Sequence, residues 1–295
     1  MVVFDFVRHA QGYHNLSADN LNMPDPNLTP LGEEQCADLR RRYAHHDRVR
    51  LFVASPLRRT LRTCLLAFGP EAAAAATAAA AAEAVAPAAP TYPENLRVVA
   101  LPELQEVSSL PSDVGSAPAV LHTEFAAEPV DLSRVQHGWN HKGLGSPYEC
   151  TIDKLEARGR AARRNLRALA AGLDADDRVV VVSHGGFLHF LTEDYDGIAP
   201  SRGTSWKNAE CRSFEFVDPT GADEDARLRE TDASRQARRG TATGLTQAEQ
   251  LELRAVYYEF LMEEVEKVAR EGVAVQFESD YATTVGQREV EAQRA

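Results

Sequence analysis

The stretch VVVVSHGGF, residues Val179 to Phe187, decides the fold. Four consecutive valines predict a strand that is buried on both faces, as in a parallel sheet. His184 follows at the carboxyl end of this strand, and the two glycines after it let backbone approach a ligand closely. Open α/β sheets bind ligands at that edge. The stretch therefore predicts an α/β protein with a site around His184.

A second apolar run ends in a pair of basic residues. Residues 4–15 read FDFVRHAQGYHN, and Arg8 and His9 stand where the run breaks into a loop. Two basic groups at the end of a buried strand are costly to desolvate, so they need an anionic partner. A phosphoryl group fits best, because Arg8 can grip its oxygens in a fork while His9 attacks phosphorus.

Two further apolar runs also end in polar residues. The segment Ser55-Pro-Leu-Arg-Arg-Thr-Leu-Arg-Thr63 predicts a turn and a helix whose first turn, with its free N–H groups and positive dipole end, favours an anion. The other apolar run, Val98–Ala100, is followed by the acidic stretch Leu101–Glu106. Three arginines of the helix cannot all point inward, so one or two are expected to be solvated: Arg58, Arg59 and Arg62. Two arginines, two histidines and a carboxylate are thus expected to meet at one sheet edge.

These ordered motifs resemble the histidine phosphatase superfamily, also called phosphoglycerate-mutase-like. Its signatures are R-H-G, S-x-x-x-R-x-x-x-T and a late H-G after a hydrophobic strand, with an Asn six residues past the first His and an L-T-x-x-G-x-x-Q segment. This chain carries them as Arg8-His9-Ala10, Ser55…Arg59…Thr63, His184-Gly185-Gly186, Asn15 and Leu28–Gln35. The resemblance covers Met1 to about Val217, and the YHN and GFLHFLTED segments look most like the fungal and plant branch.

The resemblance implies a role for each matched basic residue. His9 would be the nucleophile and form a phosphohistidine, with no metal or other cofactor needed. Arg8, Arg59 and His184 would surround the equatorial oxygens and neutralise charge in the transition state. Asn15 would donate a side-chain hydrogen bond to the phosphoryl group.

The resemblance also implies an acid that protonates the leaving oxygen and then activates water. Alignment of an L-x-E pattern places it at Glu106, while Glu103 fits the same pattern and is the rival. Substrate contacts are expected from Gln11 at the pocket mouth and from Gly185, whose backbone can approach the ligand. Asp113 is a further candidate for shaping the pocket, although an Asx-type turn explains it equally well.

Several residues have simpler explanations. Ala10 stands where the family usually has Gly, which is harmless unless the backbone there needs a positive φ. His14, His141 and His189 lack metal-ligand spacing, so surface or packing roles are expected. The segment Gly138–Gly143 suits either a lid over a ligand or a plain surface loop.

Composition limits the partners. The net charge of −12 argues against nucleic acid or an anionic membrane, and favours a local positive pocket for a small phosphorylated substrate. Four scattered cysteines without a C-x-x-C suit reduced thiols in the cytoplasm. No signal peptide or membrane-length apolar stretch is evident, so a cytoplasmic location is expected.

Strand–helix alternation predicts a three-layer α/β/α sandwich with a mostly parallel central sheet. Residues 1–217 are expected to form one domain with an Ala-rich insertion at 71–90. Cys211–Val217 alternates in polarity, as an edge strand does. Helices are expected over these ranges: Thr29 to about His46, Leu57–Phe68, Thr151–Gly172 and Phe187–Thr192.

Residues 218–295 are expected to form a connector and a C-terminal helical extension that packs on the core. The connector, 218–244, is charged and turn-rich. A capping box at Thr246–Glu249 then opens a helix that ends before Gly272. Its apolar stripe favours packing on the core, with a homodimer contact as the alternative: Leu253, Val256, Tyr257, Phe260, Leu261, Val265 and Val268.

Three classes of function fit these motifs. The favoured one is a metal-independent phosphomonoesterase; the alternatives are a phosphoglycerate-mutase-type phosphoryl transfer and a non-catalytic binder of phosphorylated ligands. Mutases of the family hold a second anionic group with extra basic residues, but Glu103–Gly145 contains only Arg134 and Lys142 as cations. A binder has no need of the nucleophile. No pattern identifies the substrate.

Overall fold

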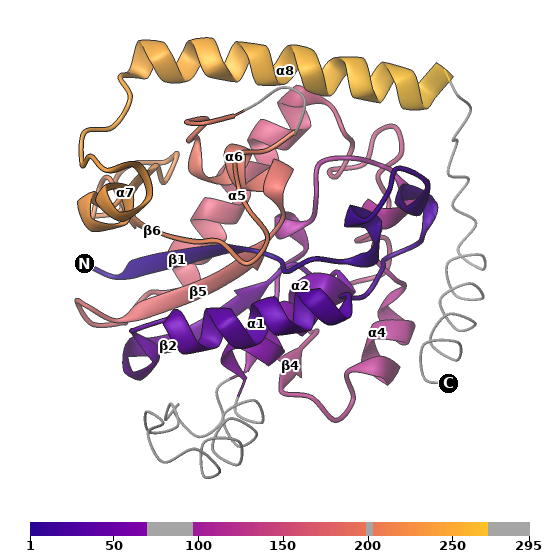
Figure 1. Ribbon diagram of the computed structural model, residues 1–295, viewed down its shortest axis with the longest axis horizontal. Coiled ribbons are helices and arrows are strands. Elements are labelled where there is room, and N and C mark those ends of the chain that lie inside the picture. Colours follow the sequence, from indigo (N-terminus) through magenta and orange to yellow (C-terminus); the bar gives the residue numbers. More distant parts are fainter. Residues whose placement is uncertain (70–96, 199–202, 271–295) are drawn as a thin grey trace.

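A mostly parallel sheet forms the centre of the molecule. The computed structural model describes residues 1–69, 97–198 and 203–270 (Figure 1). Seven strands lie in the order β4-β3-β2-β5-β1-β6-β7; only the β1–β6 and β6–β7 pairs are antiparallel. The strands are β1 Val3–Arg8, β2 Val49–Ala54, β3 Val98–Ala100, β4 Val130–Asp131, β5 Arg178–Ser183, β6 Cys211–Phe216 and β7 Leu228–Glu230. The predicted insertion at 71–90 lies outside the described residues.

Helices cover both faces of this sheet. The pair α1 and α2 lies on one face and the pair α5 and α6 on the other (Figure 1), which confirms the predicted three-layer sandwich. The helices are α1 Pro30–Arg42, α2 Arg58–Phe68, α4 Pro118–Glu124, α5 Ile152–Leu169, α6 Gly185–Thr192, α7 Asp232–Arg239 and α8 Gln247–Arg270. Within the described ranges, none of these helices is long and apolar enough to cross a membrane.

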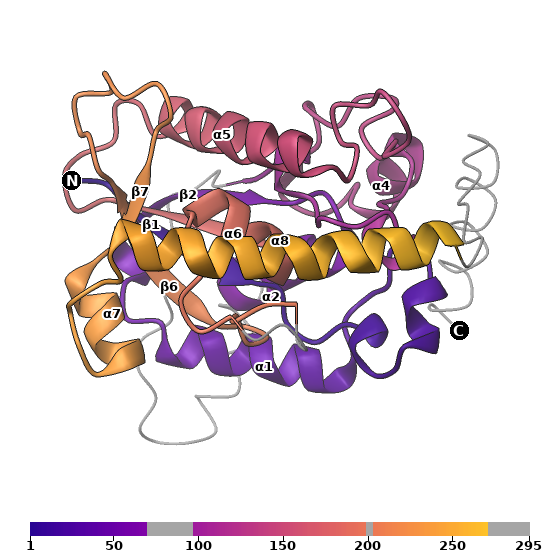
Figure 2. The same cartoon turned by 90° about the horizontal axis from the view of Figure 1, so that it is seen from above.

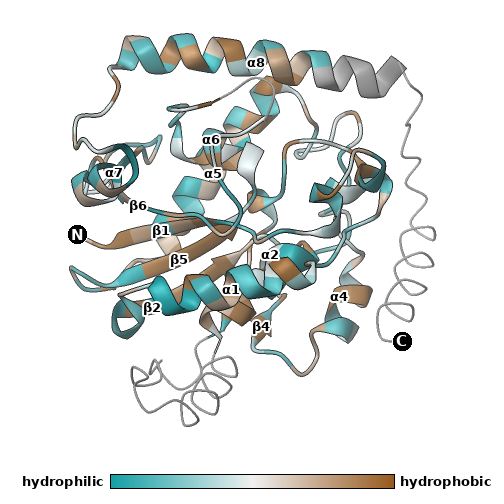
Figure 3. Cartoon of the chain, in the orientation of Figure 1, coloured by the Kyte–Doolittle hydropathy of each residue, from teal (hydrophilic) through white to brown (hydrophobic). Residues whose placement is uncertain are grey.

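The four valines of β5 explain the layering. Val180 and Val182 pack into the core beneath α1 and α2, while Val179 and Val181 pack into the core beneath α5 and α6. All four are fully buried. Successive side chains of a strand point to opposite faces, so an unbroken apolar run is what a doubly covered strand requires. Figure 3 shows the central strands as a hydrophobic band between more polar helices.

Two predictions for this region are wrong. Residues 218–244 do not form only a connector, and the strand predicted at Cys211–Val217 does not lie at the edge of the sheet. β6 pairs with β1 on one side and with β7 on the other, so β7 forms the edge. α7 follows β7, and its N-cap Thr231 accepts a hydrogen bond from the Ser234 backbone N–H at 3.3 Å. Much of the charged segment therefore belongs to the α/β domain.

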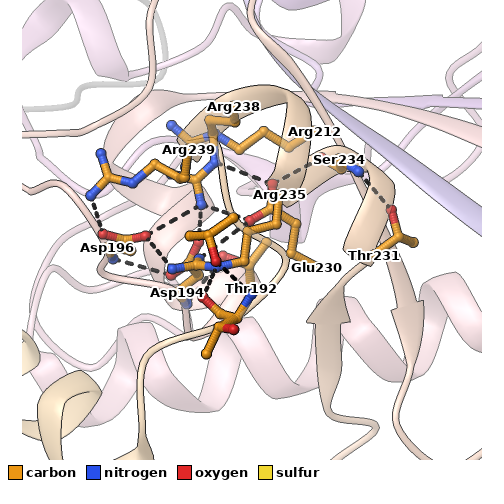
Figure 4. A network of polar contacts seen from close by, with 12 residues as sticks. Thr192, Asp194, Asp196, Arg212, Glu230, Thr231, Ser234, Arg235, Arg238 and Arg239 are labelled. Carbon is orange, nitrogen blue, oxygen red and sulfur yellow. Dashed lines mark hydrogen bonds and ion pairs between the residues drawn. The ribbon is translucent and has the colours of Figure 1, made fainter.

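The charges of this segment are used in buried ion pairs (Figure 4). Arg238 Nη2 lies 2.6 Å from a Glu230 oxygen and 3.3 Å from an Asp194 oxygen. Arg235 Nη2 lies 2.9 Å from Asp196 Oδ2. Asp194 and Asp196 follow α6, so the network ties α7 to the end of the helix that begins at His184. The sequence did not predict these ion pairs to Asp194 and Asp196, because the partners are distant in sequence and composition says nothing about such pairs.

α8 lies across α6 (Figures 1 and 2). Its capping box forms as predicted, with Thr246 N–H donating to Glu249 Oε2 at 2.7 Å. Tyr257 and Leu261 are buried in the core on the α6 side. Val256, expected in the apolar stripe, is instead 42% exposed. The side chains of Val265 and Val268 lie outside the description.

Replacing Leu261 by alanine tests how much this packing contributes. Loss of a buried leucine side chain is expected to lower the free energy of unfolding by about 2–3 kcal/mol. Met262 is 41% exposed, so Met262→Ala is the matched control and should change it by less than about 0.5 kcal/mol. Urea denaturation measures both variants. Equally small changes in the free energy of unfolding of both variants would show that burial of Leu261 does not stabilise the packing of α8.

Candidate active site

Four predicted basic residues meet at the carboxyl edge of the sheet. β1 and β5 are neighbouring parallel strands, so His9 and His184 emerge side by side, with ring centroids 5.2 Å apart. Arg59, in the first turn of α2, donates from Nη2 to His184 Nδ1 at 3.0 Å. Arg8 reaches the start of α6, where a Cβ added to Gly185 would lie 3.1 Å from Arg8 Nε. Thr204 is closer still, with its Cγ2 2.9 Å and its Oγ1 3.0 Å from that added Cβ, so Gly185 leaves room for both side chains.

His9 is held as a neutral imidazole. Its Nδ1 lies 2.7 Å from the carbonyl oxygen of Ala10, which can only accept, so Nδ1 carries the proton and Nε2 keeps its lone pair. Burial and the charge of Arg59 lower the pKa of His9 well below its usual value. The φ angle of Ala10 is not positive, so its side chain causes no backbone strain there. A buried neutral imidazole with a free Nε2 is a competent nucleophile.

The S-x-x-x-R-x-x-x-T motif supports both histidines. Ser55 Oγ accepts from His184 Nε2 at 2.9 Å, which is consistent with His184 Nδ1 accepting from Arg59. Thr63 lies one helical turn after Arg59 and its Oγ1 accepts from the Ala10 backbone N–H at 3.0 Å. The motif therefore fixes the loop that carries His9 as well as the orientation of His184.

In each of the two arginines, some N–H groups are bonded to protein atoms that the structure describes and one buried N–H group is not. Arg8 Nη1 donates to the Trp206 carbonyl at 2.6 Å, and Arg59 Nη2 also donates to Asp113 Oδ1 at 2.9 Å. The Nε atoms of Arg8 and Arg59 are buried without a partner among the described residues. Buried guanidinium N–H groups normally have acceptors, so the site is prepared for an anion with several oxygens.

The two candidate acids lie in different surroundings. The Glu106 carboxylate accepts from the backbone N–H groups of Gly186, at 3.2 Å, and Phe187, at 2.8 Å, in the first turn of α6. Burial raises its pKa. Glu103 Oε1 accepts from Asn165 of α5 at 3.1 Å instead. Glu106 thus lies beside the His184 end of the site, and Glu103 is engaged with α5.

The predicted substrate contacts take different positions. Gln11 turns to α1, where its Oε1 accepts from Thr29 Oγ1 at 2.8 Å, so its side chain is not directed at the basic cluster. Asn15 is exposed, and its Oδ1 accepts from the Gly12 backbone N–H at 3.1 Å. Asp113 is ion-paired with Arg59, so it orients an arginine rather than standing free to contact substrate.

The L-T-x-x-G-x-x-Q segment fixes the loop after His9. Gln35 Oε1 accepts from the Gln11 backbone N–H at 2.8 Å, and the Thr29 N–H donates to the Gln11 carbonyl at 3.0 Å. A Cβ on Gly32 would lie 2.1 Å from that carbonyl. The Thr, Gly and Gln of this pattern therefore hold the backbone of Gln11 close to α1.

Gly138–Gly143 is neither a lid nor a plain surface loop. Trp139 is buried at 3% exposure, and its ring occupies the space that a Cβ on Gly115 would need. Lys142 is buried as well, with Nζ donating to the carbonyls of Glu106 at 2.7 Å and Ser108 at 2.6 Å. The segment is a packed wall behind the Glu106 loop.

The expected division among the α2 arginines is partly wrong. Arg58 is as buried as Arg59, and its Nε lies 2.7 Å from Glu124 Oε2. Arg62, with 31% of its side chain exposed, pairs with Glu124 and Glu128. The acidic partners on and after α4 are distant in sequence, so the helix pattern alone could not show that Arg58 is buried away from the histidines.

Sequence reasoning missed four residues around the site. His14 is buried with its ring centroid 5.2 Å from that of His9. Asn208 Nδ2 donates to the carbonyl of His9 at 3.0 Å. Lys142 and Arg158 both donate to the Glu106 carbonyl. His14 stands in the quoted YHN segment and Lys142 in the Gly138–Gly143 segment, whereas Asn208 and Arg158 come from segments without a motif.

The chain is similar in sequence to several known proteins. The profile of the histidine phosphatase superfamily (branch 1) matches residues 4–76 and 67–231. A phosphoglycerate mutase-like protein of Arabidopsis thaliana is 28% identical over 240 residues, covering 72% of this chain and 83% of that protein. Phosphoglycerate mutase-like protein 1 of the same plant is 26% identical over 233 residues, covering 72% and 80%.

Solved structures of phosphatases also resemble the chain. A mycobacterial glucosyl-3-phosphoglycerate phosphatase matches with 20% identity and a TM-score of 0.44, covering 78% of this chain and 97% of that one. The family profile spans well over half of the chain, and the plant relatives fit the predicted plant-type branch. The protein therefore belongs to the histidine phosphatase superfamily.

Proposed function

We propose that the protein is a metal-independent phosphomonoesterase that hydrolyses a small phosphorylated metabolite through a phosphohistidine on His9. The observation that carries this proposal is the neutral, buried His9 beside two arginines, Arg8 and Arg59, whose Nε atoms are buried and have no partner in the part of the chain that the structure describes. A nucleophile and unused cationic donors at one point suit phosphoryl transfer, which depends on positioning and electrostatic stabilisation.

In the first step, His9 Nε2 attacks phosphorus and the bond from phosphorus to the leaving oxygen breaks. Glu106 gives its proton to that oxygen. The imidazolium formed on His9 is stabilised by its Nδ1–H bond to the Ala10 carbonyl. Arg8 and Arg59 neutralise the charge that spreads over the phosphoryl oxygens.

In the second step, the ionised Glu106 takes a proton from water while the water oxygen attacks phosphorus. The phosphorus–nitrogen bond breaks, phosphate leaves and His9 returns to its neutral form. Glu106 is thereby protonated again, so the cycle closes without net change in the enzyme.

The alternative mutase reaction has less support. A mutase must hold a second anionic group of its substrate, and Lys142 was one of only two cations in the expected segment. Lys142 is buried and donates to two backbone carbonyls, those of Glu106 and Ser108, so it is committed to the wall of the site. This leaves Arg134 of the pair for a second anion.

Phosphate release from a panel of phosphomonoesters, measured in EDTA, tests the proposal. We expect release to survive the chelator and to differ among sugar, nucleotide and aliphatic phosphates. Retained binding of inorganic phosphate without release from any ester would contradict the proposal and favour a non-catalytic binder.

Glu106→Gln and Glu103→Gln form a matched pair that tests the acid. Loss of a general acid slows reaction by roughly 10²–10⁴-fold, so Glu106→Gln should lower kcat/KM for an alkyl phosphate by about that factor. Glu103, which is bonded to Asn165, should tolerate the same change within about threefold. Steady-state kinetics decides; the reverse order would transfer the role to Glu103.

The pH profile follows from the same assignment. Burial raises the pKa of Glu106, which extends the pH range over which the carboxyl keeps its proton. The first step needs that proton, so kcat/KM for alkyl phosphates should fall as pH rises through this pKa, and activity should be favoured below neutral pH. A rate that rises steadily through pH 9 would contradict the assignment.

A further inference from the structure

A second histidine lies against the proposed nucleophile. His14 belongs to the short 3-10 turn Tyr13–Asn15, and its side chain is buried at 8% exposure. Its ring centroid lies 5.2 Å from that of His9, as close as the ring of His184. His14 is therefore part of the basic cluster, although the sequence favoured only a surface or packing role.

Packing alone does not explain why this residue is a histidine. His14 Nδ1 is buried and has no hydrogen-bond partner within residues 1–69, 97–198 and 203–270. A buried histidine with a structural role, His189, has both nitrogens engaged: Nδ1 lies 2.6 Å from the Asp194 carbonyl and Nε2 3.2 Å from Thr204 Oγ1. A buried polar atom left unpaired costs free energy that a phenylalanine of similar shape would avoid.

The loop is built to admit this ring. A Cβ on Gly12 would lie 2.8 Å from His14 Nδ1 and 2.9 Å from Cε1, so Gly12 makes room for that edge of the imidazole. The edge against Gly12 cannot meet a ligand. Nε2 is then the nitrogen that remains to contact a group bound beside His9.

The charged groups around His14 point to an anion. His14 faces His9 and His184 at the strand ends, Arg8 on β1 and Arg59 on α2. Burial, followed by the charges of Arg59 and Arg8, lowers the pKa of His14 to about 2, so the ring is neutral in the free enzyme. A neutral imidazole keeps one N–H donor, and an arriving dianion strengthens that hydrogen bond.

We propose that His14 is a further catalytic residue, whose neutral imidazole donates a hydrogen bond from Nε2 to the bound phosphoryl group. This inference rests on the proposed function only in taking the anion beside His9 to be a phosphoryl group. Within the described residues, no three His, Cys, Asp or Glu side chains are arranged to hold a metal ion, so a cluster of metal ligands is not an alternative reading of these histidines.

His14→Phe and His14→Gln separate this role from packing. Phenylalanine keeps the ring volume and removes the donor, while glutamine keeps an N–H donor. Because a hydrogen bond to a charged group contributes substantially to the free energy of binding, His14→Phe should raise the Kd for inorganic phosphate about tenfold or more. In His14→Gln the affinity should be partly restored. Calorimetric titration of phosphate into each full-length variant measures this, with His45→Phe, at an exposed histidine, as the control expected to match wild type.

Unchanged phosphate affinity in His14→Phe, with a melting temperature equal to that of wild type, would overturn the proposal. Equal weakening in both variants would do so too, because a lost donor should be partly restored by glutamine. Parallel assays of ester hydrolysis keep the two proposals apart. Wild-type protein that binds phosphate through His14 but hydrolyses no ester would contradict the phosphatase and leave the His14 site standing.

Discussion

Replacing His9 by alanine should lower kcat by at least about 10⁴-fold, the largest effect expected for any single change in this protein. Removing the nucleophile from a covalent mechanism costs losses of this order, because the residual site can only stabilise charge. His9 is buried at 1% exposure, and its Nδ1–H bond to the Ala10 carbonyl leaves Nε2 as the nitrogen that can attack phosphorus. Single-turnover and steady-state phosphate release measure the loss.

Two controls give this result its meaning. His9→Ala should still bind inorganic phosphate, since Arg8 and Arg59 remain, and should unfold at nearly the wild-type temperature. Rapid acid-free quenching of wild type with labelled substrate should trap a phosphorylated protein that the variant lacks. A variant that keeps more than about a tenth of the wild-type rate would exclude a phosphohistidine on His9.

Arg59→Lys should also give a large effect, a loss of about 10³-fold in kcat/KM. Lysine keeps the charge but loses the planar fork, and arginine groups that stabilise transferring phosphoryl groups are worth this much. Arg59 also orients His184 through the 3.0 Å contact with Nδ1 and pairs with Asp113, so its loss disturbs two further groups. Kinetics with an aryl phosphate measures the chemical step directly.

Arg58→Lys is the matched control. Arg58 is the neighbouring residue on α2, equally buried, and its partner is Glu124 rather than the histidines. This substitution should lower the free energy of unfolding, because a buried ion pair loses its geometry, but should change kcat/KM by less than about threefold. Similar kinetic losses in both variants would mean that α2 transmits a general disturbance and that Arg59 has no special role.

The basic cluster could be predicted because its members lie at the carboxyl ends of strands or in the first turn of the helix that follows one. Arg8, His9 and His184 stand directly after runs of buried residues, and parallel strands end at the same edge, so sequence position fixed their meeting place. Arg59 follows in the same way from the first turn of α2. The meeting place of these four residues could therefore be predicted from local pattern. The side chains of Gln11 and Asp113 are instead bonded to Thr29 and Arg59, which local pattern did not show.

The supporting residues could not be predicted in this way. Lys142 and Arg158 donate to the Glu106 carbonyl from two separate segments, and no pattern in either segment predicted that contact. Arg58 is as buried as a core residue, and its ion pair with Glu124 of α4 compensates its charge there. β7 looked like a mobile connector because its short, charged strand has no alternation long enough to recognise.

The sequence by itself determined the doubly covered parallel sheet and the edge where the histidines and arginines gather, since burial of the β5 valines and the ends of strands depend on local pattern. Only the tertiary structure decided which carboxylate caps α6, which charges are neutralised by distant partners, and that His14 lies beside His9 with an unpaired nitrogen. Those outcomes depend on desolvation and on hydrogen-bond partners from segments far apart in the chain. Neither can be predicted from the local order of residues.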